Sequence, residues 1–172
     1  MKVLFLDHDG VICLSDEWGG RFKKKGFDSN PETPLDIRMD NFNVKAVKVL
    51  NSIIDITGCE IVVSSDWKLQ GPLSQMIEMY VTRGIKPPID YTPNMEDFDE
   101  DGHHLLKTAS DYEGIRVNEI NEYLKNHPEI THWVAVDDMD LSELTNFVIT
   151  KKPHREGIKQ SGVKDKILKF LS

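Results

Sequence analysis

The chain alternates short apolar runs with longer segments in which apolar residues recur at helical spacing. Runs short enough to be buried strands occupy residues 2–6, 60–65, 132–140 and 147–150, with a candidate edge strand at 89–92. Amphipathic helical spacing appears in residues 44–56, 72–83, 115–124 and 163–171. Strands that alternate with helices predict an α/β fold, in which right-handed crossovers build a mostly parallel central sheet.

Three of the predicted strands end in polar residues. The residues concerned are Asp7 and Asp9 just after the first run, Ser64 and Ser65 in the second, and Asp137 and Asp138 in the run at 132–140. Open parallel sheets bind ligands at the carboxyl ends of their strands. We therefore expect a functional site at that edge of the sheet.

Asp7 and Asp9 are two residues apart, so in a continuous strand their side chains would share one face. Gly10 is expected to bend the chain just after them. Neighbouring carboxylates are costly unless a cation neutralises them or one holds a proton, and Mg²⁺ prefers oxygen ligands. The alternative is a strand end that carries two solvated acids.

The segment 5–12, Phe-Leu-Asp-His-Asp-Gly-Val-Ile, resembles the first motif of the haloacid dehalogenase (HAD) superfamily, in which an apolar strand precedes D-x-D-x-[TV]. The resemblance implies that Asp7 is the nucleophile toward a phosphoryl group. It also implies that Asp9 is the general acid and base, with Mg²⁺ bound between the two carboxylates. His8 is not distinctive in this comparison.

The second motif of that superfamily is a Ser or Thr that closes the second strand. Ser64 is the best match and Ser65 the next, although either serine could instead cap a helix or form a turn. The run S-S-x-W-[KR] is similar to HAD phosphatase-like domains of phages and RNA-repair proteins. Trp67 in this run is expected either in the core or in the pocket wall.

Arg116 best fits the third motif, a cation that holds the phosphoryl group, and Lys107 and Lys68 are the alternatives. Its predicted place at the start of a helix, where the dipole disfavours a cation, also points to a bound anion. In the fourth motif the resemblance implies that Asp138 ligates Mg²⁺ directly and that Asp137 supports the metal site.

Together the motifs imply a HAD-type, Rossmann-like three-layer sandwich with a minimal cap. We expect one domain over residues 1–172, with a small cap or flap insertion at about 14–42 and a polar, acidic segment at 94–114. The implied activity is a Mg²⁺-dependent phosphohydrolase that forms an aspartyl-phosphate. The preferred substrate is a nucleotide or a nucleic-acid 3′-phosphate end, and the alternative is a non-catalytic binding or regulatory protein on the same scaffold.

Composition narrows the choice of partners. The formal net charge of -8 and the pI near 5.2 argue against extended nucleic-acid contacts, which need many Lys and Arg. The chain has no apolar run of membrane-spanning length, and from its first residues we expect no export. Two cysteines without metal spacing are expected to be buried thiols, which favours the cytoplasm.

Overall fold

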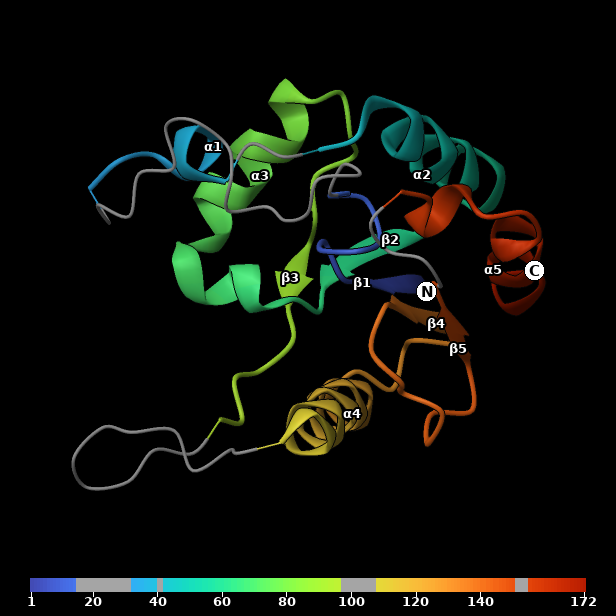
Figure 1. Cartoon of the computed structure of the whole chain (residues 1–172). Coiled ribbons are helices and arrows are strands. Elements are labelled where there is room, and N and C mark those ends of the chain that lie inside the picture. The colour runs from blue at the N-terminus through green and yellow to red at the C-terminus, as the bar shows by residue number, and fades with distance from the viewer. Residues whose placement is uncertain (15–31, 40–41, 97–107, 151–154) are drawn as a thin grey trace, which may run out of the picture.

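The computed structural model describes residues 1–14, 32–39, 42–96, 108–150 and 155–172, and these residues build a five-stranded sheet (Figure 1). The strands are β1 (Lys2–Leu6), β2 (Glu60–Val63), β3 (Asp90–Tyr91), β4 (His132–Asp137) and β5 (Phe147–Ile149). Their order is β3-β2-β1-β4-β5, and every neighbouring pair is parallel. The predicted α/β class and parallel central sheet are confirmed.

Helices cover both faces of the sheet and so complete the three layers. The helices are α1 (Leu35–Arg38), α2 (Val44–Thr57), α3 (Leu73–Thr82), α4 (Ala109–Asn126) and α5 (Val163–Phe170), with 3₁₀ turns η2 (Asp66–Gln70) and η3 (Gly157–Lys159). Figure 1 shows α4 on one side of the sheet and α2, α3 and α5 on the other. None of the helices in the described part of the chain has the length and apolar character needed to cross a membrane.

The alternation of side chains along β1 explains the two halves of the core. Val3 and Phe5 join a buried cluster that contains Ile120 of α4, whereas Leu4 and Leu6 join the larger cluster formed with α2, α3 and α5. Successive residues of a strand point to opposite faces, so both sets are fully buried. This parity also decides the direction in which the polar residues at the strand end point.

Helix α4 begins at Ala109, two turns before the expected start near residue 115. A capping box between Thr108 and Asp111 satisfies amides at its start, and Gly114 lies inside the helix although it reads as a breaker. Arg116 therefore lies in the third turn, and the argument that placed it at the positive end of the helix dipole is wrong.

The course of the chain changes direction beside β1. From β1 the chain builds β2 and β3 toward one edge and then returns to add β4 and β5 on the other side. The crossovers thus diverge at the carboxyl ends of β1 and its neighbours, which is the position where open α/β sheets place their sites. Most of the insertion expected at 14–42 and much of the acidic segment at 94–114 lie outside the described residues.

Candidate active site

The parallel register brings the polar ends of the three central strands to one level. Leu6 of β1 pairs with Val63 of β2 and with Val136 of β4, so the next residues, Asp7, Ser64 and Asp137, align. The amide of Asp7 donates to the Val136 carbonyl at 3.1 Å, and the amide of Ser64 donates to the Leu6 carbonyl at 2.9 Å. By parity all three side chains point to the face that α4 covers.

Three carboxylates gather at this level. One oxygen from each of Asp7, Asp137 and Asp138 lies within 4.8 Å of the others, and Asp7 and Asp137 are buried while Asp138 is partly buried. These are three of the four predicted metal ligands, and the fourth, Asp9, is not a member of this cluster. Hard carboxylate oxygens packed at this spacing fit the oxygen-ligand preference of Mg²⁺.

The electrostatics of the cluster also fit a bound cation. Burial and then the neighbouring carboxylate of Asp137 raise the pKa of Asp7 well above its usual range, although Arg116 opposes the shift. Burial likewise raises the pKa of Asp137, against the lowering effect of Arg116 and of the backbone amide of Met139. A cation at the cluster would remove much of the cost of ionising both groups.

Arg116 reaches from α4 into the acidic cluster. Its Nη1 lies 3.4 Å from Oδ1 of Asp7 and 3.1 Å from Oδ2 of Asp137, and it also donates to the backbone carbonyl of Ser64. Its Nη2 donates to Oδ1 of Asp66 at 2.6 Å. Burial disfavours the charge, but Asp137 and Asp7 raise the pKa of Arg116 overall, so the guanidinium stays positive.

Lys68 and Lys107 are the alternatives to Arg116 as the third-motif cation. Nζ of Lys68 is buried in an ion pair with Glu119 and donates to Oγ1 of Thr92 at 3.2 Å, so it joins η2 to α4 rather than to the acidic cluster. Lys107 lies outside the described residues. Of the two described candidates, Arg116 is therefore the one that contacts the first-motif and fourth-motif acids.

The two serines at the end of β2 have separate surroundings. The side chain of Ser65 caps η2 by accepting from the amide of Trp67, which is the capping role that the sequence allows for either serine. The hydroxyl of Ser64 is buried and has no hydrogen-bond partner among the described residues. A buried unpartnered hydroxyl beside a carboxylate cluster is a ready donor for an incoming anion.

Asp9 and His8 take part in a different set of contacts, on the α3 side of β1. The indole Nε1 of Trp67 donates to Oδ2 of Asp9 at 2.8 Å, and Nε2 of His8 lies 2.8 Å from the hydroxyl of Tyr80. Burial, and then the charge of Arg116, lower the pKa of His8 to about 3, so the ring is neutral. His8 shares strand parity with Leu4 and Leu6, and that parity was the sequence signal for its burial.

The loop after β1 is held by hydrogen bonds from the C-terminal part of the chain. Gly10 has a φ of 73°, and its carbonyl accepts from Oγ1 of Thr150 at 3.0 Å. The amide of Ile158 donates to the Val11 carbonyl at 2.9 Å. These contacts hold the loop that carries Asp9 against the end of β5 and η3.

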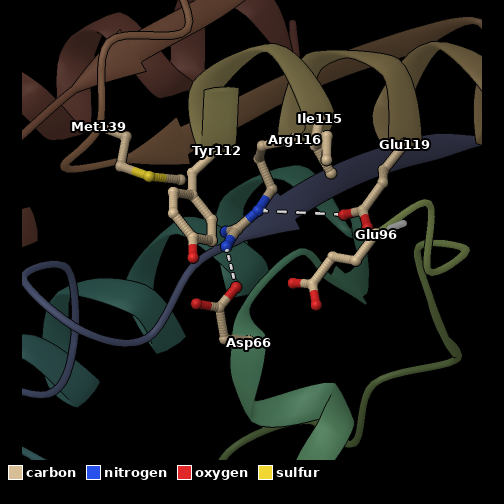
Figure 2. A pocket seen from close by; sticks show the side chains of 7 residues that line it. All are labelled: Asp66, Glu96, Tyr112, Ile115, Arg116, Glu119 and Met139. Atoms are coloured by element: carbon tan, nitrogen blue, oxygen red, sulfur yellow. Dashed lines mark hydrogen bonds and ion pairs between the residues drawn. The ribbon is translucent and has the colours of Figure 1, made fainter. Parts of the chain in front are cut away.

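A small pocket of about 60 Å³ opens beside Arg116 (Figure 2). Its lining combines three acids, one arginine and three less polar side chains, namely Asp66, Glu96, Tyr112, Ile115, Arg116, Glu119 and Met139. Figure 2 shows the guanidinium of Arg116 between the carboxylates of Asp66 and Glu119. Sequence reasoning missed Asp66 and Glu119, although Glu119 follows Arg116 at the i+3 spacing of helix neighbours.

A parallel sheet with acids ending its first and fourth strands, a hydroxyl ending its second and an arginine between them defines a HAD-type domain. The chain matches the family model for the HAD domain in Swiss Army Knife RNA repair proteins over residues 3–161, and it belongs to that family. No curated protein and no solved structure matches the chain. The predicted superfamily and the relation to RNA-repair proteins are confirmed.

Proposed function

We propose that this protein is a Mg²⁺-dependent phosphomonoesterase that acts through an aspartyl-phosphate on Asp7. The observation that carries the proposal is the meeting of Asp7, Asp137 and Asp138 beside Arg116 and the Ser64 hydroxyl, which has no hydrogen-bond partner within the described ranges. A nucleophile, a cation and a neutral donor placed around one point are the parts that phosphoryl transfer needs. Membership of a HAD family supports a phosphohydrolase in general.

In the first half of the reaction, a carboxylate oxygen of Asp7 attacks phosphorus and the bond from phosphorus to the ester oxygen breaks. Asp9 gives a proton to that leaving oxygen, so the product leaves as an alcohol. In the second half, Asp9 takes a proton from water, the water oxygen attacks phosphorus, and Asp7 is released with inorganic phosphate. Each half therefore uses one carboxylate as nucleophile or leaving group and the other as the proton carrier.

The remaining groups of the site stabilise the charges of the carboxylates and of the phosphoryl group. Mg²⁺ held by Asp7, Asp137 and Asp138 would neutralise the carboxylates and stabilise negative charge on the phosphoryl oxygens. Arg116 stays positive and offsets the charge of Asp7 and Asp137 through its Nη1. Ser64 donates to a phosphoryl oxygen without adding charge.

As substrate we propose a nucleotide or the 3′-phosphate end of a nucleic acid. The RNA-repair context of the family supports a phosphorylated nucleic-acid end. The net charge of -8 supports recognition of the end itself rather than of a long stretch of backbone, because few counterions would be released.

The test is phosphate release with Mg²⁺, with and without a chelator, on nucleoside monophosphates, sugar phosphates and 3′-phosphorylated oligonucleotides. We expect metal-dependent release, strongest with the nucleotide substrates, and loss of at least about 10³-fold in kcat for Asp7→Asn. Asp140→Asn is the matched control, because Asp140 is an exposed acid beyond the cluster whose carboxylate accepts from the Ser142 amide. This control should keep the wild-type rate.

Asp7→Asn should also fold normally, because a neutral amide removes a carboxylate whose ionisation burial already opposes. Turnover by Asp7→Asn at more than a few per cent of the wild-type rate would contradict the nucleophile assignment. Silence of the wild-type protein on the whole panel would contradict the enzyme and favour a non-catalytic binding or regulatory protein.

A further inference from the structure

Trp67 and Asp9 are 58 residues apart, yet the indole Nε1–H of Trp67 donates to Oδ2 of Asp9 at 2.8 Å. Trp67 is 3% exposed and lies in η2, immediately after the end of β2, whereas Asp9 lies in the loop after β1. The contact therefore joins the loops that follow two adjacent strands. It reaches the carboxylate to which the proposed mechanism gives both proton transfers.

Three aromatic residues hold the indole ring in place. It stacks on His8 with ring centres 4.5 Å apart and planes 6° from parallel, and Phe42 meets it edge-on at 5.7 Å. The ring of Tyr80 meets that of His8 edge-on at 5.7 Å and packs the stacking partner in turn, while its hydroxyl lies 2.8 Å from Nε2 of His8. The indole cannot rotate away from Asp9 without breaking this buried cluster.

We propose that Trp67 is a positioning residue that aims the carboxyl group of Asp9 at the leaving oxygen of the substrate, an inference that rests on the proposed function. The chain turns at Gly10, where φ is 73°, so Asp9 lies in a loop, and the contact with the indole holds its carboxyl group in one direction there. An indole N–H donates a hydrogen bond but accepts no proton. Trp67 therefore orients Asp9 without competing for the proton that Asp9 transfers.

The test compares two esters that differ in their need for a proton. A 3′-nucleoside monophosphate releases an alcohol and requires general acid assistance, whereas p-nitrophenyl phosphate releases a stable phenolate. The two esters are compared by kcat/KM, because this constant reports only on the steps up to phosphoryl transfer to Asp7. For Trp67→Phe we expect kcat/KM to fall by about tenfold or more on the nucleotide and by less than about threefold on the aryl ester.

Tyr80→Phe is the matched control. It removes a buried hydrogen bond from the same aromatic cluster, on His8, and leaves the contact between Trp67 and Asp9 in place. This variant should lower the unfolding temperature, yet the ratio of kcat/KM between the two esters should stay at the wild-type value. Equal losses on both esters in Trp67→Phe would indicate a purely structural role and overturn the proposal.

Asp9→Asn separates the inference from the proposed function. This variant should show the same selective loss on the nucleotide, larger than in Trp67→Phe. If Asp9→Asn leaves the ratio of kcat/KM between the two esters unchanged, the general-acid role in the proposed function fails, and the inference fails with it. If Asp9→Asn changes this ratio between the esters and Trp67→Phe does not, only the role of Trp67 is overturned.

A second measurement needs no change at Trp67. The protein has three tryptophans, and Trp18→Phe and Trp133→Phe assign their indole N–H signals in a ¹H–¹⁵N spectrum. Asp9→Asn should move the signal of Trp67 upfield, because a neutral amide oxygen is a weaker acceptor than a carboxylate. An unchanged Trp67 signal in Asp9→Asn would contradict the hydrogen bond on which the proposal rests.

Discussion

Asp66 places a carboxylate beside Arg116, close to the acidic cluster at which the proposed mechanism binds the substrate phosphate. Its side chain is 64% exposed, and Oδ1 accepts from Nη2 of Arg116 at 2.6 Å. The carboxylate thus occupies a donor of the arginine and also repels an incoming dianion. Under the proposed function, we expect both effects to oppose substrate binding.

Asp66→Asn should therefore lower KM for a phosphomonoester by about fivefold, which corresponds to about 1 kcal/mol of removed repulsion between charges near a protein surface. Asp165→Asn makes the same change of net charge on an exposed residue of α5 and should leave KM unaltered. Steady-state kinetics on one nucleotide substrate compare the two variants. An equal or higher KM in Asp66→Asn would show that Asp66 does not compete with the phosphate.

The residues that could be predicted from sequence are those at strand ends. Asp7, Ser64 and Asp137 follow apolar runs directly, and parallel pairing brings such ends to one edge, so their meeting could be foreseen. The separate roles of Ser64 and Ser65 could not, because both follow the same strand and only the fold shows which one caps η2. The contact between Trp67 and Asp9 was equally hidden, since it depends on how two loops fold over adjacent strands.

At the scale of elements, η3 sets the position of the loop after β1. Gly157, with a φ of 50°, packs directly on that loop, and a Cβ placed on it would lie 2.3 Å from the carbonyl oxygen of Val11 and 2.9 Å from that of Gly10. These are backbone atoms, so no side-chain rotation relieves the clash. The loop that carries Asp9 is therefore fixed by an element from the other end of the chain.

Gly157→Ala should lower the free energy of unfolding by about 2–4 kcal/mol, the sum of strain at a positive φ and overpacking against backbone. Gly162→Ala is the matched control, because Gly162 also has a positive φ, 82°, but its added Cβ meets nothing within 4 Å. It should lose only about 1–2 kcal/mol for the left-handed conformation. Urea unfolding measures both, and equal losses would show that the loop yields to the Cβ.

Helix α4 shows where element prediction fails. Its apolar spacing was visible from Val117 onward, but its first two turns are polar and contain Gly114, so pattern alone placed the start too late. The signal that marks the true start is the capping box of Thr108 and Asp111. The central strands β1, β2 and β4 were easier, because each contains a continuous apolar run that is buried on both faces.

At the scale of the whole molecule, the order of the strands makes the site. The strands that carry the key acids, β1 and β4, are far apart in sequence but adjacent in the sheet. Helix α4 packs on one face of the sheet and brings Arg116 into contact with Asp7 and Asp137. The same arrangement buries Asp7 and Asp137 together, which is costly unless a cation offsets their charge and is typical of functional sites. The class of fold and the family follow from these features together.

The measurement that tests the central claim most directly is a search for the phosphoryl group on Asp7. Asp9→Asn should slow hydrolysis of the intermediate more than its formation from p-nitrophenyl phosphate, because the aryl ester needs no proton to leave. After acid quenching, mass spectrometry of the peptide that contains Asp7 should then show one added phosphoryl group in Asp9→Asn and none in a variant that also carries Asp7→Asn. Phosphate release without any phosphorylated Asp7, or a phosphoryl group on another residue, would contradict the account.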